Sequence, residues 1–175
     1  MKPLREVAES YMALADAQRQ LLEGAYEAAA ASCRKAMDSS RRMPPEEAFD
    51  HAGFEAFCHA GLAEALARLG LHEEALQSAD LALNYFNRRG ELNQDEGKLW
   101  IMAVFSRALA LDGLGRGADA LKEFRKASEM LAERKGETPA REALLAEAAG
   151  RIDALGSLAK PEKPAGYRAW WEFWS

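Results

Sequence analysis

The sequence has few of the features that mark a disulfide-stapled or nucleic-acid-binding protein. Its 175 residues include only two cysteines, Cys33 and Cys58, which are too few for a disulfide framework, so we expect two reduced, buried thiols. Positive charge is not in excess, because 23 Lys and Arg stand against 28 Asp and Glu. A nucleic-acid-binding domain normally carries a basic face, so we expect no nucleic-acid partner.

Long apolar segments are also missing. No stretch approaches the roughly 20 uncharged apolar residues that a membrane-spanning helix needs. The first ten residues contain Arg5, Glu6 and Glu9, and they lack the apolar run of a secretory signal. We therefore expect a cytoplasmic protein with no membrane partner.

Motifs that support catalysis or metal binding are absent as well. The chain has no glycine-rich phosphate loop, no His-Glu-x-x-His, no Cys-x-x-Cys and no Gly-x-Ser-x-Gly. His51, Cys58 and His59 lie near one another in sequence, but Cys58 and His59 are adjacent and would diverge by about 100° on a helix. We predict a protein that is not an enzyme, with no catalytic residue, metal or cofactor.

What the sequence does contain is typical of a single all-α domain. Hydrophobic residues make up 49% and charged residues 29%, enough for a core in a chain of this length. Val, Ile and Thr are scarce, whereas Ala, Leu, Glu and Arg are abundant, which favours helices over strands.

An internal repeat organises most of the chain. Gly24, Gly70 and Gly115 are 46 and 45 residues apart, and each is followed five residues later by an alanine. Around each glycine the same small or bulky positions recur; they are Ala17, Ala63 and Ala108, then Ala29, Ala75 and Ala120, then Cys33, Ala79 and Phe124, and then Ala36, Ala82 and Ala127.

This pattern resembles the tetratricopeptide repeat (TPR) over roughly residues 8–135. In such repeats the small residues let two helices approach closely, and the glycine permits the tight turn between them. The period exceeds the usual 34 residues by 11 or 12, about three helical turns, so we expect longer helices with the same buried side.

We predict three long antiparallel helix pairs and a C-terminal capping helix, a TPR-like solenoid over 1–158. Pro45 and the acidic residues after it favour a helix start, and Asn93 to Glu96 has capping-box spacing. The predicted helices lie near 4–22, 25–42, 45–69, 72–89, 93–114, 117–135 and 139–157. The capping helix would cover the last repeat with an apolar stripe that includes Leu144, Ala148, Ile152 and Leu155.

The resemblance also implies a groove lined by the first helix of each pair. Carried over position by position, the candidate groove residues are Tyr11, Leu14, Gln18, Phe57, Glu64, Met102 and Phe105. The Lys and Asn that hold an acidic peptide terminus in some TPR proteins are absent, so an apolar peptide or an amphipathic helix fits better. The alternative is that these residues are simply core, because three repeats leave little open groove.

Pairs of cations end the second helix of each unit, and they have two explanations. The pairs are Arg41 and Arg42, Arg88 and Arg89, and Arg134 and Lys135. Cations at a helix C-terminus stabilise the helix dipole by about 0.3–1 kcal/mol each, which requires no ligand. Alternatively, stacking of the units would align the pairs as a basic edge for an acidic or phosphate-bearing ligand.

The last segment, 159–175, is a Pro- and Gly-containing linker followed by an aromatic tail. Tyr167, Trp170, Trp171 and Trp174 are spaced i, i+3, i+4, i+7, so a short helix would present one aromatic stripe. Such a stripe reduces solubility if it stays exposed, so we expect it to dock on its own chain, on a second copy or on a partner. A disordered tail is the alternative. Docking on a second copy would make a homo-oligomer.

Overall fold

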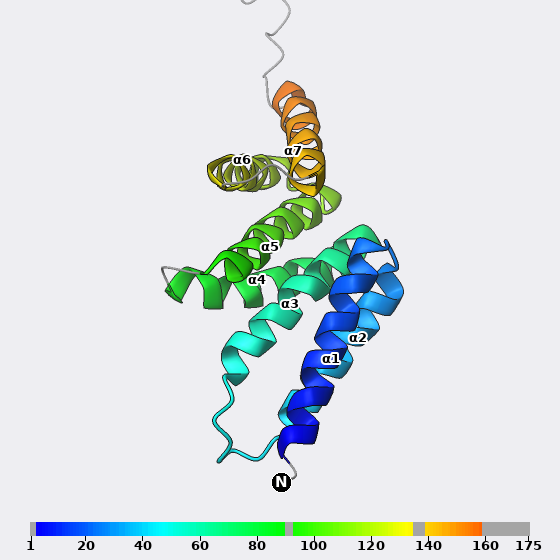
Figure 1. Ribbon diagram of the computed structural model, residues 1–175. Coiled ribbons are helices and arrows are strands. Elements are labelled where there is room, and N and C mark those ends of the chain that lie inside the picture. The colour runs from blue at the N-terminus through cyan, green and yellow to red at the C-terminus, as the bar shows by residue number, and fades with distance from the viewer. Residues whose placement is uncertain (1–2, 90–92, 135–138, 159–175) are drawn as a thin grey trace, which may run out of the picture.

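The computed structural model describes residues 3–89, 93–134 and 139–158, and its regular structure there is entirely helical, which confirms the all-α prediction. The helices are α1 (Pro3–Leu22), α2 (Tyr26–Arg41), α3 (His51–Arg68), α4 (His72–Arg89), α5 (Gln94–Gly113), α6 (Gly117–Glu133) and α7 (Pro139–Leu158). They pack as the pairs α1–α2, α3–α4 and α5–α6, with α7 against α6 (Figure 1).

The three repeat glycines make the same turn in each pair. Gly24, Gly70 and Gly115 have φ values of 74°, 78° and 74°, in the left-handed region where a side chain is unfavourable. In the first turn Gly24 N–H donates to the Leu21 carbonyl at 3.2 Å, and Ala25 N–H donates to the Gln20 carbonyl at 2.9 Å. This is the Schellman arrangement, and equivalent bonds recur at the other two glycines.

The repeated small residues lie where helices touch. Ala29, Ala75 and Ala120 are fully buried, as the repeat predicts. The other repeated positions are buried too; they are Ala17, Ala63, Ala108, Cys33, Ala79, Phe124, Ala36, Ala82 and Ala127. Because alanine projects only a methyl group, helix backbones approach closely at these positions.

The helices form two layers. The first helices, α1, α3 and α5, lie side by side, with contacts from α1 to α3 and from α3 to α5 (Figure 1). The second helices pack against the next unit, α2 on α3 and α4 on α5. One continuous core therefore runs through the stack, as in a helical solenoid.

One predicted boundary is wrong. The helix expected from residue 45 begins at His51, and residues 45–50 are a loop. Asp50 caps α3, because its Oδ1 accepts a hydrogen bond from Gly53 N–H at 3.0 Å. Phe49 packs against the rings of Tyr11 and Phe54, which ties the loop to α1 and to the first turn of α3. The predicted cap of α5 is confirmed, since Asn93 Oδ1 accepts from Glu96 N–H at 2.9 Å.

The capping helix covers the end of the stack. Ala148 and Leu155 of α7 are buried, and Leu144 and Ile152 pack against the same core. Gly117, at the start of α6, comes close to Leu155, whose Cδ2 lies 3.4 Å from where a Cβ would stand. The predicted stripe therefore closes the third unit.

Candidate binding groove

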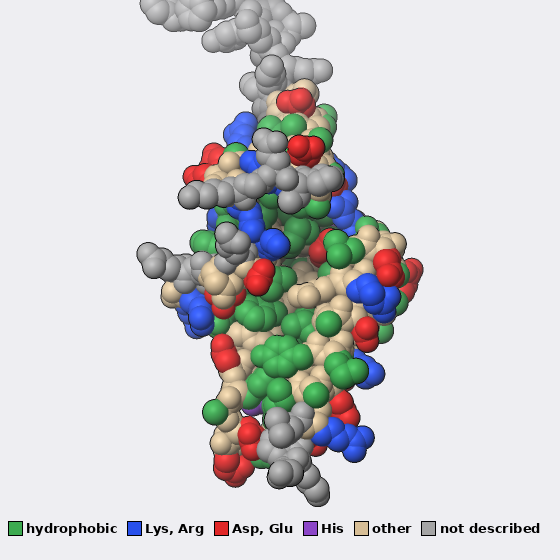
Figure 2. Space-filling model, in the orientation of Figure 1, with side chains coloured by type: hydrophobic (Ala, Val, Ile, Leu, Met, Phe, Trp, Pro, Cys, Tyr) green, Lys and Arg blue, Asp and Glu red, His purple; other side chains and the backbone are tan. Residues whose placement is uncertain are grey.

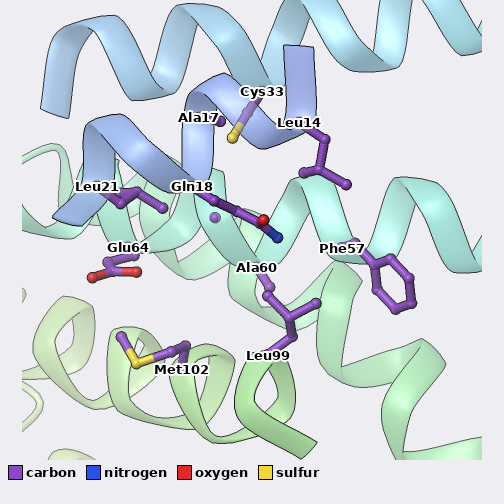
Figure 3. A pocket seen from close by; sticks show the side chains of 11 residues that line it. Leu14, Ala17, Gln18, Leu21, Cys33, Phe57, Ala60, Glu64, Leu99 and Met102 are labelled. Atoms are coloured by element: carbon purple, nitrogen blue, oxygen red, sulfur yellow. The ribbon is translucent and has the colours of Figure 1, made fainter. Parts of the chain in front are cut away.

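A shallow apolar depression lies on the face formed by the first helices. It is lined by Leu14 and Gln18 from α1, Phe57 and Glu64 from α3, and Met102 from α5 (Figure 3). We call the surface made by these five residues the groove face. The enclosed space is only about 30 Å³, room for one water molecule, so the face is nearly filled by its own side chains.

The five groove-face residues are all among the seven predicted groove candidates, and two candidates lie elsewhere. Tyr11 is 52% exposed and packs edge-on against Phe54 at 5.2 Å, beyond the depression on α1. Phe105 is fully buried, with its ring 5.6 Å from that of Phe124. The assignment of Phe105 to the groove is thus corrected: this side chain belongs to the core between α5 and α6.

Several lining residues are not among the candidates that the sequence predicts. Leu99 lies one helical turn before Met102, a spacing that could have indicated it. Cys33 reaches the floor from α2, beside Gly61, where an added Cβ would stand 3.2 Å from its Sγ. Gly61 therefore lets α2 and α3 come together under the groove face.

Glu64 is the polar feature of this face. Burial raises the pKa of its carboxyl, and the Arg68 guanidinium one turn later opposes part of that rise. Arg68 makes its own hydrogen bonds to Glu147. Among the described residues, none donates a hydrogen bond to Glu64, whose carboxylate points toward the depression near Met102 (Figure 3). The groove face thus carries one half-buried carboxylate that accepts no hydrogen bond from the described residues and remains open to solvent.

The groove face belongs to a wider apolar surface. Figure 2 shows hydrophobic side chains gathered along the face of α1, α3 and α5, with charged residues toward its margins. Tyr11, which is 52% exposed, lies on the same side of α1 as Leu14 and Gln18 and extends the apolar area along that helix. A contiguous apolar surface of this kind is typical of an interaction site.

The first pair of candidate basic residues is engaged within the fold. Arg41 Nε donates to Glu55 at 2.8 Å, which ties the end of α2 to α3. Arg42 donates to Ser39 Oγ at 3.0 Å and lies 3.8 Å from Glu9 of α1. These contacts give both cations a structural role.

The later pairs differ from one another. Arg89 lies 3.5 Å from Glu96 and donates to the Tyr85 hydroxyl at 2.8 Å. Arg88 forms no ion pair or hydrogen bond with any residue that the structure describes. Arg134 is partly buried at the end of α6, and Lys135 lies outside the described residues.

The two thiols and the nearby histidines do not form a metal site in the described part of the chain. No group of three or more His, Cys, Asp or Glu side chains that could hold an ion occurs there. Cys33 and Cys58 are free and buried, and burial raises the pKa of Cys33 to about 12, so the thiol stays protonated. The ring of His51 packs against that of Phe49 at 4.9 Å.

The structure also bears on the expected membrane helices and on the aromatic tail. Within the described residues, no helix combines the length and the apolar character needed to cross a membrane. The tail candidates Tyr167, Trp170, Trp171 and Trp174 lie outside the described residues.

Comparisons with known proteins agree with this architecture. The model of the family described as Domain of Unknown Function (DUF3856) matches residues 2–144. A crystal structure of a TPR-like protein from Chlorobium tepidum matches with a TM-score of 0.85 and 70% sequence identity, over 89% of this chain and 99% of that one. None of the curated proteins matches in sequence. The chain therefore belongs to the DUF3856 family and has the fold of a TPR-like helical repeat protein.

Proposed function

We propose that this protein is a non-catalytic cytoplasmic interaction scaffold that binds an amphipathic helix or an apolar peptide on its groove face. One observation carries the proposal. Three successive first helices present apolar side chains on one surface, and among them lies the Glu64 carboxylate, to which no described residue donates a hydrogen bond. A TPR-like fold typically serves protein interaction, which supports the same function.

The chemistry of the groove face indicates what it would bind. Leu14, Phe57 and Met102 supply apolar area, and an occupant would gain about 25 cal/mol for each Å² of apolar surface that it buries. An occupant that covers Glu64 would shield its carboxylate from water, so the occupant would place an N–H or a cationic group over it. Because the enclosed space is small, we expect the occupant to lie across the face.

The aromatic tail is a candidate occupant within the chain itself. Trp170, Trp171 and Trp174 carry indole N–H donors, and Arg168 carries a cation, which matches the apolar face and the acceptor at Glu64. Seventeen residues follow Leu158, and an extended chain of that length spans about 55 Å. A tether also raises the local concentration to about millimolar. Docking on the same chain would shield the groove face, and docking on a second copy would make a homo-oligomer.

Tryptophan fluorescence of the full chain tests this docking. A Trp100→Phe background leaves only the tail indoles, which should emit blue-shifted light and resist quenching by iodide. Met102→Glu, which places a second carboxylate beside Glu64, should shift the emission to the red and expose the indoles. The matched variant Leu22→Glu adds the same charge on α1 at a residue that is 86% exposed, and it should change neither property.

The binding of other partners needs a separate measurement. A photo-crosslinking amino acid at Met102 of the full chain, in cells that make the protein, should yield adducts of defined mass. The same crosslinker at Leu22 should not. Tail indoles that quench like free tryptophan would exclude self-docking, and a Met102 crosslinker with no adduct to partner or tail would exclude the scaffold function.

A second candidate function is the binding of an acidic or phosphate-bearing ligand through the repeated arginine pairs. The observation that favours it is Arg88, which is exposed and has no ion pair within the described structure. Binding of this kind weakens with salt, whereas binding on the apolar groove face persists. Affinity measured at two salt concentrations therefore separates the two candidates.

A further inference from the structure

A larger cavity lies on the other side of α3, between α3 and α4. Its volume is about 450 Å³, and its wall includes Ala52, Ala56 and His59 of α3 and Leu81, Asn84 and Arg88 of α4. Successive residues of a helix are about 100° apart, so His59 faces about 140–160° away from Phe57 and Glu64, and the two depressions share no lining residue. This cavity, which we call the α3–α4 cavity, is therefore separate from the groove face.

The charges around the α3–α4 cavity leave one cation unpaired. Glu55 contributes to the wall but is bound by Arg41 at 2.8 Å. Arg89 also contributes and lies 3.5 Å from Glu96. Arg88 alone among the described lining cations has no anionic partner. The lining side chains Glu55, Arg88 and Arg89 thus sum to one positive charge, and the nearby Asp50 carboxylate is engaged by the Tyr85 hydroxyl at 3.4 Å and by Gly53 N–H at 3.0 Å.

His59 adds a hydrogen-bond donor to the same wall. Its Nδ1 is buried and has no hydrogen-bond partner within the described structure. Burial lowers the pKa of the imidazole, which favours the neutral ring with one N–H. A buried N–H without an acceptor is rarer and more costly than a bare lone pair, so the proton belongs on Nε2. The Nε2–H is then available to the cavity.

The remaining wall is suited to an apolar group. Leu81 is a large apolar side chain that is 48% exposed, and the methyl groups of Ala52 and Ala56 lie opposite on α3. The volume falls within the range of about 300–1,000 Å³ that is usual for small-molecule pockets. Convergent polar groups above an apolar floor are the ordinary composition of such pockets.

We propose that the α3–α4 cavity binds a small organic oxyanion, a carboxylate or phosphate monoester attached to an apolar body. The acid group would accept hydrogen bonds from the Arg88 guanidinium, His59 Nε2–H and the Asn84 amide, and the body would cover Ala56 and Leu81. This inference rests on the second candidate function but places the ligand in one cavity, whereas the candidate function spreads binding along all three arginine pairs. The proposed binding in the α3–α4 cavity does not depend on the groove face.

NMR titration of the full chain with phenyl phosphate, benzoate and inorganic phosphate tests the proposal. Phenyl phosphate should cause saturable shifts of the Ala56, His59 and Leu81 amides, and inorganic phosphate should bind more weakly because it has no apolar body. Benzoate compared with phenyl phosphate distinguishes a carboxylate from a phosphate ligand. Arg88→Gln should weaken binding roughly tenfold or more, the loss expected for one charge-assisted contact. Arg125→Gln, at another exposed arginine without an ion pair in the described structure, should leave it unchanged.

Further variants distinguish the α3–α4 cavity from the basic edge. His59→Phe should weaken binding, and His59→Gln, which keeps an N–H donor, should restore part of it. Arg42 lies in another unit, so Arg42→Gln should not change the affinity for phenyl phosphate. Equal losses of affinity in Arg42→Gln and Arg88→Gln would overturn binding in the α3–α4 cavity and would support binding along the basic edge. The absence of saturable shifts, or equal affinity in Arg88→Gln and Arg125→Gln, would overturn the proposal. Thermal melting of both arginine variants checks that folding is unaffected.

Discussion

Arg68 of α3 and Glu147 of α7 form a two-point ion pair across 79 positions of sequence. Arg68 Nη1 lies 2.8 Å from Glu147 Oε1, and Nη2 lies 2.9 Å from Oε2. The two side chains are 25% and 27% exposed, so solvent screens the pair only in part. The guanidinium also lies over the ring of Phe105, 5.9 Å from its centre. The pair therefore ties the capping helix to the second unit.

We predict that Glu147→Gln loosens the capping helix. The variant leaves the Arg68 guanidinium without its carboxylate, and we expect a loss of about 1–3 kcal/mol in the free energy of unfolding. Urea denaturation measures the loss, and hydrogen exchange should show that the α7 amides lose protection first. Asp153→Asn makes the same charge change at an exposed residue of α7 and should have little effect. Equal stability of the two variants would contradict a stabilising role for the pair.

The repeated alanines give a second prediction. Ala75 is fully buried where α3 and α4 touch, so Ala75→Leu should overpack the contact and lower the free energy of unfolding by about 1–3 kcal/mol. Thermal and urea denaturation measure the change. Ala28→Leu, at an exposed position of α2, introduces the same side chain and should be nearly neutral. An Ala75→Leu protein as stable as its parent would show that close helix packing does not depend on this alanine.

The units could be predicted from the sequence because their determinants are local. Gly24, Gly70 and Gly115 are needed for left-handed turns, and the alanines around them mark helix contacts, so their spacing alone indicated three pairs. The start of α3 could not be predicted in this way. Pro45 favoured an early start, but Phe49 packs against Tyr11 of α1, a tertiary contact that keeps residues 45–50 out of the helix.

The groove face was predictable only in part, for a geometric reason. The rotation between successive units determines which side of α5 faces α1 and α3. Helical periodicity does not specify that rotation. Met102 therefore lies at the depression, whereas Phe105, three residues later, packs against Phe124 in the core. The α3–α4 cavity could not be predicted from the sequence, because it depends on how α3 and α4 pack, although the repeated cation pairs do indicate Arg88 as a candidate.

Two glycines of different conformation should respond oppositely to substitution by alanine. Gly70 has φ 78° and no atom within 4 Å of an added Cβ, so Gly70→Ala should destabilise by about 1–2 kcal/mol through backbone strain alone. Gly150 lies within α7, also with open space around it, so Gly150→Ala should stabilise by about 0.5–1 kcal/mol. Urea denaturation measures both. A Gly70→Ala protein as stable as its parent would show that the turn tolerates a side chain, and a destabilised Gly150→Ala protein would contradict the expected gain in α7.

The last prediction concerns Glu64 and pH. Its pKa in the folded protein is raised by burial, so between the ordinary value of 4.5 and the folded value the native state binds more protons than the unfolded state. The contribution of Glu64 to stability therefore becomes less favourable as pH rises through that interval, and it stays unfavourable at neutral pH. Glu64→Gln removes this titration while keeping the shape of the side chain.

We expect Glu64→Gln to be more stable than its parent at pH 7, with the difference shrinking as pH falls toward 4. Urea denaturation of both proteins across this range measures the difference, and the subtraction cancels the titration of carboxylates that do not interact with Glu64. Glu147→Gln serves as the contrasting variant, because removal of a bonded carboxylate should cost stability at neutral pH. If Glu64→Gln were instead less stable at pH 7, Glu64 would have a donor within the fold. The groove face would then offer no free acceptor, and the requirement that an occupant supply an N–H or a cation would be removed.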